Sequence, residues 1–438
     1  MTDISARPAG SFLGRNRDFR RFLTASLLVD AAVQIEAVTI GWQIYALARE
    51  TRSVEESALL VGMVGLAQFL PLFCLSLFAG STADRRDRRG IILACLALET
   101  LCVLVLLAMA FRPVPSFAAI FAVAAIFGGA RAFLSPASSA FVPMLVGRSD
   151  MARAISLKSL SWQMSVIVGP WFGGFLCAHS AALAYGVTAA LYAGGVVLLL
   201  RVPSRGRPEP PEGSRMEQIR EGLAYVWGNR IVLGAISLDL FAVLLGGATA
   251  LLPAFATDVL EVGPSGFGLL RSGPALGAAA MALFLARRPL RRNAGPRMFW
   301  AVAAFGVATL VFAVSKHVWL SLVALAALGA ADMISVYVRQ TLIQIVTPDH
   351  MRGRVASVSS VFISGSNELG EFESGVAARL LGPVGAAVFG GLGTIVVTGL
   401  WAWGFPELRR VDRVDGEPGH AEPPHAHAAT AAASPTME

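Results

Sequence analysis

Apolar residues form long blocks along this chain, in place of the alternating or one-sided patterns of soluble strands and helices. Blocks such as Ile91–Leu98 and Leu101–Phe111 contain few polar breaks. A mostly apolar segment of about 20 residues is long enough to cross the hydrocarbon core of a bilayer as a helix. The pattern therefore predicts an all-α polytopic membrane protein.

Twelve predicted spans account for the apolar blocks. They are Phe22–Leu47, Ser57–Thr82, Gly90–Phe111, Ser116–Ala140, Ile155–Ala178, Leu183–Val202, Ile231–Ala256, Gly266–Ala286, Met298–Ser315, Val318–Thr341, Val355–Leu380 and Gly385–Phe405. We expect five segments: an N-terminus (1–21), a six-helix bundle (22–202), a linker (203–230), a second six-helix bundle (231–405) and a tail (406–438). The linker contains RMEQIREGLAYVWGN, which predicts an amphipathic helix along the membrane surface. The Pro-, Ala- and His-rich tail is predicted to be disordered.

Composition supports the membrane assignment. Hydrophobic residues make up 55% of the 438 residues and charged residues only 15%, against roughly 25% charged in soluble domains. This excludes a disordered chain, a coiled coil, a collagen-like fibre and most soluble enzymes. Four cysteines, Cys74, Cys95, Cys102 and Cys177, lie inside apolar blocks without metal-ligand spacing, so we interpret them as packed small side chains.

The net charge of +7 is interpreted as a topology signal, and no nucleic-acid partner is expected. Of the 36 Lys and Arg residues, 28 lie in segments that share one side if the N-terminus is cytoplasmic, and four lie in loops on the other side. Because positive residues are enriched in cytoplasmic loops, both termini are predicted to be cytoplasmic.

The two halves of the chain look duplicated. The stretch Val146–Trp162 resembles Val346–Phe362, and matching residues are 200 positions apart. Both stretches connect the fourth span of their half to the fifth. Two parallel six-span repeats joined by a cytoplasmic linker are the plan of one large transporter fold.

The loop after the second span carries the sequence GSTADRRDRR over residues 80–89, in which Gly80 permits close helix approach. Asp84 is placed to meet the positive N-terminal end of the eleventh span. Arg85, Arg88 and Arg89 supply the positive charges, and Arg88 or Arg89 bridging to the other half would make a latch that shuts the cytoplasmic side. The alternative is a basic loop that only sets topology.

This loop resembles the signature of the major facilitator superfamily, a Gly followed four residues later by Asp-Arg and then by a basic pair. The departure is Asp87, where many members have Gly. A second motif, in the fifth span, is Gly169-Pro170-Trp-Phe-Gly173-Gly174. It resembles the core of the superfamily's antiporter motif, a kinked seam of close helix packing that limits leakage. Ordinary small-residue packing is the alternative.

Polar and charged residues within the predicted spans are candidate proton and substrate ligands. A charge at mid-bilayer costs at least about 2.5–3.5 kcal/mol, so its presence indicates function by default. The candidates for a central cavity are Asp30, Gln34, Glu36, Arg131, Asp332, Asn367, Glu368 and Glu371. We expect Glu36 or Glu368 to carry the proton, with Asp30 next and Arg131 as the modulating cation. Glu99, Asp239, Arg271 and Arg379 are weaker candidates, and structural pairing is the alternative role for each acid.

No enzyme chemistry is predicted. The chain has no Walker A motif, zinc-ligand spacing or nucleophile elbow, so we expect no cofactor. The tail histidines His420, His425 and His427 are not expected to bind a metal, because a flexible tail lacks the fixed geometry that a metal site needs.

Beyond the superfamily, two runs are similar to the enterobactin-exporter-type branch: FLSPASSAFVPMLVGRSDMARAISLKSLSWQMSVIVGPWFGG and QTLIQIVTPDHMRGRVASVSSVFISGSNELGEFESG. The resemblance extends over about 15–405. It implies a bacterial inner-membrane exporter of siderophores or hydrophobic drugs such as macrolides, driven by proton exchange. Separately, we expect a monomeric chain in the lipid bilayer. The cargo stays open. The alternatives are an importer of a small solute and a non-transporting assembly or sensor protein.

Overall fold

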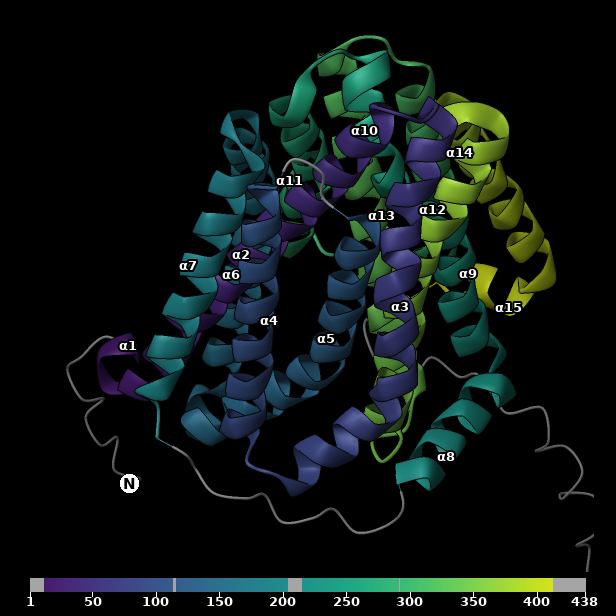
Figure 1. The fold of residues 1–438 in the computed structure, drawn as a ribbon. Helices are drawn as coiled ribbons and strands as arrows, with labels where there is room; N and C mark the ends of the chain where they lie inside the picture. Colours follow the sequence, from purple (N-terminus) through teal and green to yellow (C-terminus); the bar gives the residue numbers. More distant parts are fainter. Residues whose placement is uncertain (1–11, 113–115, 204–214, 291, 413–438) are drawn as a thin grey trace, which may run out of the picture.

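A computed structural model describes residues 12–112, 116–203, 215–290 and 292–412, without the side chains of residues 77, 80, 81, 83, 84 and 215–218. This part of the chain consists of helices and their connections, without a strand (Figure 1). The first half contains α1 (Phe12–Arg15), α2 (Arg17–Arg49), α3 (Val54–Arg85), α4 (Arg88–Ala110), α5 (Phe117–Leu145), η1 (Arg148–Asp150), α6 (Met151–His179) and α7 (Ala181–Leu200).

The second half follows α8 (Arg215–Gly228). It contains α9 (Arg230–Gly246), η2 (Thr249–Leu251), α10 (Leu252–Ala254), a π-helical turn η3 (Phe255–Val259), α11 (Gly263–Arg287), α12 (Ala294–Val314), α13 (Val318–Val346), α14 (Arg352–Gly404) and α15 (Pro406–Arg409).

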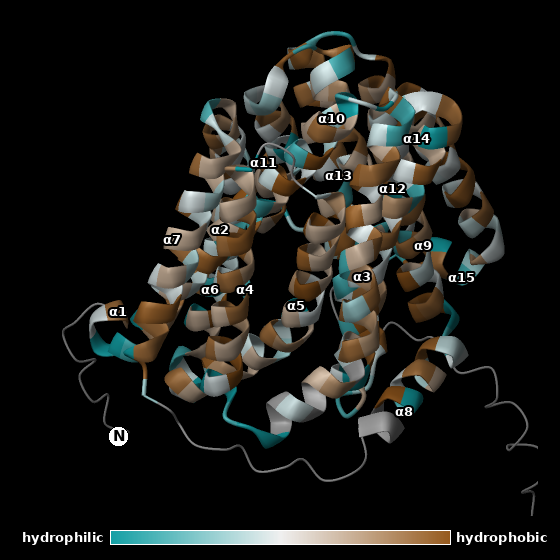
Figure 2. Cartoon of the chain, in the orientation of Figure 1, coloured by the Kyte–Doolittle hydropathy of each residue, from teal (hydrophilic) through white to brown (hydrophobic). Residues whose placement is uncertain are grey.

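Within the described residues, ten helical segments are long and apolar enough to cross a membrane. One of them, α14, has 53 residues, which at 1.5 Å per residue is about 80 Å, more than twice a bilayer core. It is two spans, since the backbone at Gly382 (φ 74°, ψ 164°) breaks the helix and Pro383 follows. With the more polar α6, the described chain has the twelve predicted spans. Figure 2 shows the apolar residues along the helices and the hydrophilic ones mainly at loops.

Side-chain caps fix where several helices begin. Ser53 accepts a hydrogen bond from the backbone N–H of Glu56 at the start of α3, and Ser180 does the same for α7. Asp87 caps α4 by accepting from the N–H groups of Arg89 and Gly90. Asp87, the departure from the superfamily signature, therefore has a structural role, because it occupies two of the amide donors that a helix start leaves without partners.

The seventh predicted span is not one straight helix. We expected a helix over Ile231–Ala256, but α9 ends at Gly246 and the chain continues through η2, α10 and the π-turn η3. Two adjacent glycines, Gly246 and Gly247, weaken the helix at this point, and Pro253 lies at the start of α10. The break brings Thr249 and Asp258 into positions that a continuous helix would not give them.

The two halves meet along two helix pairs, α3 with α14 and α6 with α11. We call the end of the bundle where α2 ends and α3 begins the gate end, which is at the top of Figure 1. The opposite end, near α8, is the α8 end. Helix α8 lies where the amphipathic pattern predicts a helix, and it docks on the second half. There Glu221 pairs with Arg354 of α14, and the Tyr225 hydroxyl donates to the Val346 carbonyl at 2.9 Å.

The tail is ordered further than predicted. We expected disorder from Pro406, but Pro406–Arg409 forms α15, and Leu408 is fully buried. Beyond it, Asp412 and Val411 accept hydrogen bonds from the first backbone amides of α12. The prediction is therefore wrong for residues 406–412, because this segment caps a helix. Residues 413–438, with the three tail histidines, lie outside the described residues.

Candidate functional site

A cavity of about 120 Å³ lies between the two halves, walled by α2, α3, α5 and α7 on one side and by η2, α10, α11 and α14 on the other. Its polar lining residues are Gln34, Glu36, Gln68, Arg131, Tyr192, Thr249, Arg271, Glu368 and Glu371. Apolar side chains such as Val61, Phe127 and Phe267 complete the wall. The cavity therefore holds three acids and two arginines within a largely apolar bundle.

Arg131 of α5 connects the halves at this cavity. Its Nη1 atom donates to Gln68 Oε1 of α3 at 3.2 Å and lies 3.7 Å from Glu368 Oε1 of α14. Gly128, one turn before Arg131, packs directly on the backbone carbonyl of Gln68. A side chain at Gly128 would separate α5 from α3, so this glycine positions the arginine beside Gln68.

Glu36 lies on the first-half wall and is 6% exposed. The hydroxyl of the fully buried Tyr192 on α7 donates to Glu36 Oε2 at 2.8 Å. Arg131 interacts with Glu36 electrostatically. Glu36 thus has one neutral donor and one cation near it, and it faces the cavity.

Glu368 and Glu371 face the cavity from α14, one helical turn apart. Helix α14 comes close to α3 because Gly65 has no side chain: a Cβ atom there would lie 2.8 Å from the Glu368 carbonyl oxygen and 2.9 Å from Glu371 Cβ. Arg271 of α11, which also lines the cavity, interacts electrostatically with Glu368. The second-half wall therefore presents two acids and one cation.

Three predicted cavity residues lie elsewhere. Asp30 pairs with Lys158 of α6 at 2.6 Å, inside the first half. Asp332 lines a second, very small cavity inside the second half, together with Asp239, which pairs with Arg339. Asn367 is exposed and does not line the central cavity. The structure brings together Gln34, Glu36, Arg131, Glu368 and Glu371.

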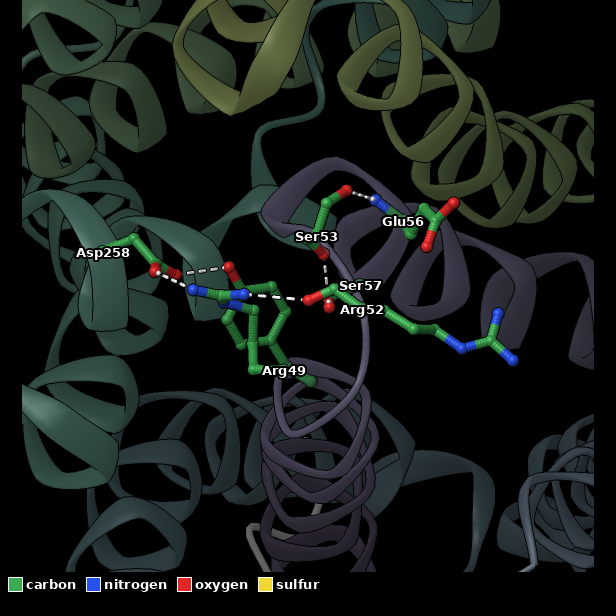
Figure 3. A network of polar contacts seen from close by, with 7 residues as sticks. Arg49, Arg52, Ser53, Glu56, Ser57 and Asp258 are labelled. Atoms are coloured by element: carbon green, nitrogen blue, oxygen red, sulfur yellow. Dashed lines mark hydrogen bonds and ion pairs between the residues drawn. The ribbon is translucent and has the colours of Figure 1, made fainter.

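At the gate end, ion pairs join the two halves. Asp258, in the π-turn η3 of the second half, accepts from the Tyr45 hydroxyl at 2.5 Å and from Arg49 Nη2 at 3.1 Å (Figure 3). A second pair joins Glu56 of α3 to Arg379 of α14 at 3.0 Å. In the described part of the chain, the ion pairs between the halves lie at the gate end or at the central cavity.

The antiporter-like motif lies in the seam that closes this end. Gly169 and Gly173 pack on α2, where Cβ atoms would lie 2.5 Å from Gln34 Cβ and 3.0 Å from Ile35 Cα. Gly174 faces the other half: its Cβ would lie 2.8 Å from Gly268 Cα of α11. Pro170 contributes its carbonyl oxygen, which contacts Gly268 directly. The motif therefore holds α6 between its own bundle and the second half.

A matching glycine contact joins α3 to α14. A Cβ atom on Gly375 would lie 2.9 Å from Gly62 Cα. Gly375 ends the run Gly370-Glu-Phe-Glu-Ser-Gly375, which follows the same spacing as Gly169 to Gly174 about 200 residues earlier. Gly370 packs on α9, as Gly169 packs on α2. The duplicated halves thus close the gate end through two equivalent glycine seams.

The arginines of the 80–89 loop contact their own half. Arg88 donates to the Ala140 carbonyl of α5 at 2.9 Å. Arg89 donates to the Leu199 and Leu200 carbonyls at the end of α7, at 3.2 and 2.8 Å, where the negative end of the helix favours a cation. Arg85 is exposed. The side chains of Gly80 and Asp84 lie outside what the structure describes.

Several cavity residues escaped the sequence analysis. Gln68 and Tyr192 were not among the candidates, and Arg271 was ranked low because it lies near a predicted span end. Glu99 of α4, which lies outside the cavity lining, was also ranked low, yet it is only 1% exposed. The sequence signal that could have identified these residues is a polar or charged side chain within an otherwise apolar block. No group of three or more metal-ligating residues occurs among the described residues.

Together these features define a class of protein: a membrane transporter of two six-helix bundles around a polar central cavity, in the major facilitator fold. The chain belongs to the transmembrane secretion effector family, whose model matches residues 13–433. This agrees with the resemblance predicted from the sequence motifs.

Similar proteins include the enterobactin exporters EntS of Shigella boydii serotype 18 and Escherichia coli O139:H28. Each is 26% identical over 403 residues, covering 91% of this chain and 94% of the relative. Family and relatives are transporters, in agreement with the prediction that the chain is not an enzyme.

Solved structures share the fold. A D-xylose-proton symporter superposes with a TM-score of 0.68 at 13% identity, over 91% of this chain and 98% of that one. A bacterial homologue of the human lysosomal transporter Spinster, in an inward-facing and occupied conformation, gives 0.68 at 15% identity, over 92% and 98%. At such identities the likeness shows the fold alone.

Proposed function

We propose that this chain is a proton-coupled exporter that moves a hydrophobic or siderophore-like small molecule across the bacterial inner membrane in exchange for protons. The observation that carries the proposal is the central cavity, where Arg131 of one half faces Glu368 of the other at 3.7 Å. Because Arg131 belongs to one bundle and pairs with a carboxylate of the other, movement of the bundles changes this pairing. The protonation of the carboxylates is thereby linked to the arrangement of the halves. The family and the exporter relatives support the direction.

Orientation is part of the proposal. The distribution of Lys and Arg supports a cytoplasmic α8 end, with both termini and the linker 203–230 on that side. The gate end then faces the periplasm. Because the inter-half ion pairs gather at the gate end and the cavity, we assign this conformation as inward-facing. The bundles 22–202 and 231–405 would rock about the cavity as two bodies within a monomer.

The cavity must widen for a cargo to enter. Its volume of about 120 Å³ is below the roughly 300–1,000 Å³ of pockets that hold drug-sized ligands. Three acids and two arginines favour a cargo with several hydrogen-bonding groups, and the apolar wall favours one with a hydrophobic body. Both properties belong to siderophores and to macrolides.

The test uses inverted membrane vesicles, which expose the cytoplasmic face, and two probes: labelled enterobactin and a labelled macrolide. With an acid-inside pH gradient, vesicles that contain the protein should accumulate at least one probe. A protonophore should abolish that accumulation. Accumulation that ignores the gradient would contradict proton coupling, and uptake only by right-side-out vesicles would favour the importer.

Topology is tested separately in intact cells. A single cysteine placed in the tail beyond Asp412, with the four native cysteines replaced, should resist a membrane-impermeant thiol reagent until the cells are permeabilised. Labelling in intact cells would overturn the proposed orientation, and the α8 end would then be assigned to the periplasmic side.

A further inference from the structure

A second acid is buried behind the central cavity, on α4. Glu99 is 1% exposed, and among the described residues neither of its carboxylate oxygens has a hydrogen-bond partner. It does not line the cavity. An ionised carboxylate without hydrogen bond or ion pair costs several kcal/mol to bury. Glu99 is therefore in its neutral, proton-bearing form in this conformation.

The charged and titratable groups that act on Glu99 lie on α2, on α5 and α7, which pack directly on α4, and on α4 itself. Glu36 of α2, Arg131 of α5 and Tyr192 of α7 interact with it electrostatically. On α4, Cys95 and Cys102 lie one turn to either side. Arg131 is the cation of this group, and its ion-pair partner in this conformation is Glu368 in the other half.

Movement of the halves changes this balance. When α5 and α14 separate, Arg131 loses Glu368 but stays in the first half beside Glu36 and Glu99. Arg131 is partly exposed to the cavity and keeps Glu36 as an acidic neighbour, so loss of Glu368 leaves the surroundings of Glu99 one unit more positive, which favours the ionised carboxylate. Ionisation of Glu99 replaces the lost negative charge: its O–H bond breaks, the carboxylate compensates Arg131, and the proton leaves by way of Glu36 to water in the central cavity, so that Glu36 and Glu99 are both ionised afterwards.

We propose that Glu99 is a second proton-binding group of the transporter, which holds a proton while Arg131 pairs with Glu368 and releases it when that pair separates. This inference rests on the proposed proton coupling. It assigns Glu99 the role of a reserve partner for Arg131, away from the cargo.

The first measurement reads the proton without transport. Infrared spectra of the full chain in lipid at neutral pH should contain a carbonyl band of a neutral carboxyl group free of hydrogen bonds. Glu99→Gln should remove that band, because the amide resembles the neutral acid in shape and keeps the fold. Identical carbonyl regions in the wild-type protein and Glu99→Gln would overturn the inference.

The second measurement reads coupling. In proteoliposomes with labelled enterobactin and macrolide, Glu99→Gln should keep counterflow exchange but lose the part of the accumulation that a pH gradient drives. Thr100→Val is the matched control, since Thr100 is the next residue of α4 and its hydroxyl only donates to the Leu96 carbonyl at 2.6 Å; it should retain both activities.

The outcomes separate the two proposals. If the wild-type protein shows no gradient-driven accumulation, proton coupling is wrong and the role of Glu99 falls with it. If the wild-type protein and Glu99→Gln are driven equally, only the role of Glu99 is wrong. Loss of counterflow in Glu99→Gln, with a normal Thr100→Val, would make Glu99 a structural residue and also overturn the inference.

Discussion

Arg131 and Glu368 belong to different halves of the molecule and lie 3.7 Å apart at the wall of the central cavity. Gln68 shares the arginine from the side of the first half. The contact is thus asymmetric: Arg131 keeps its neutral partner in any arrangement of the halves, whereas its charged partner depends on their separation. Removing the charge on either side of this boundary should therefore act on coupling before it acts on folding.

Glu36→Gln and Glu368→Gln separate the two walls of the cavity. In the first variant the amide oxygen of the new side chain can still accept from Tyr192, so this variant should insert and fold normally. We expect a coupling residue to lose pH-gradient-driven uptake into inverted vesicles while counterflow stays near the wild-type rate. If both variants keep full gradient-driven transport, neither residue carries the proton, and Asp30, Asp332 or Glu371 is next.

Asp258→Asn should loosen the gate end. The change weakens two charge-assisted contacts, to Tyr45 and Arg49, in a partly exposed setting. A loss of about 1 kcal/mol shifts the ratio of conformations by about five-fold. Opening of the gate end is measured by cysteine accessibility. Thr249→Cys on the cavity wall, in a background without native cysteines, should react faster with an impermeant reagent in intact cells when Asp258→Asn is present than when Asp258 is retained.

The control for the gate is Glu261→Gln, which removes one acid three residues away, at an exposed position. It should leave the labelling rate of Thr249→Cys unchanged. Equal rates in both variants would mean that the general charge at this end, and not the Asp258 contacts, determines opening.

Gly174→Val should disturb the seam between α6 and α11. Even the Cβ atom would lie 2.5 Å from the Pro264 carbonyl oxygen, and overpacking of this kind typically costs about 1–3 kcal/mol. We expect normal membrane insertion with transport reduced about ten-fold, because the closed gate end is the destabilised state. Gly186→Val on α7, where an added Cβ atom would meet no atom of another helix within 4 Å, should transport normally; a similar loss there would refute the seam.

Asp84→Asn tests the predicted latch of the 80–89 loop. If the Asp84 charge meets the N-terminal end of α14 in the outward-facing state, its removal should strongly reduce transport without affecting insertion. Asp87→Asn is the matched control, because asparagine also caps a helix and the same loop loses one negative charge. Wild-type flux from reconstituted Asp84→Asn would remove the latch.

The spans and their grouping can be predicted from the sequence, because the length of an apolar block shows whether it crosses the bilayer and a residue's position within the block gives its depth. Depth does not determine which way a residue faces. Asp332 lies mid-span as expected, but it faces Asp239 inside its own bundle. Asn367 and Glu371 share a helix face on an ideal wheel, yet Glu368 and Glu371 line the cavity. The packing of α14 on Gly65 decides between these faces, and that contact is long-range.

The opposite error occurs at Arg271 and Glu99: the sequence analysis ranked both low, although the packing of the helices places them at or near the central cavity. Both have the sequence signature of an intramembrane charge, and both were ranked low. Arg271 reaches the cavity because α11 begins at Gly263 and is drawn against α6 at Gly268. Glu99 is buried on α4, which packs on α5 and on α7, and α7 is distant from α4 in the sequence.

At the two glycine seams, Gly62 with Gly375 and Gly174 with Gly268, the nearest atoms across the contact belong to the backbone. Such surfaces have no side chains that interlock, so one helix can roll over the other without changing rotamers or breaking hydrogen bonds. The ion pairs then contribute to which arrangement is favoured, and seams free of side chains allow one arrangement to become the other quickly. Substitutions there should appear mainly in the turnover rate, with little change in the affinity for cargo.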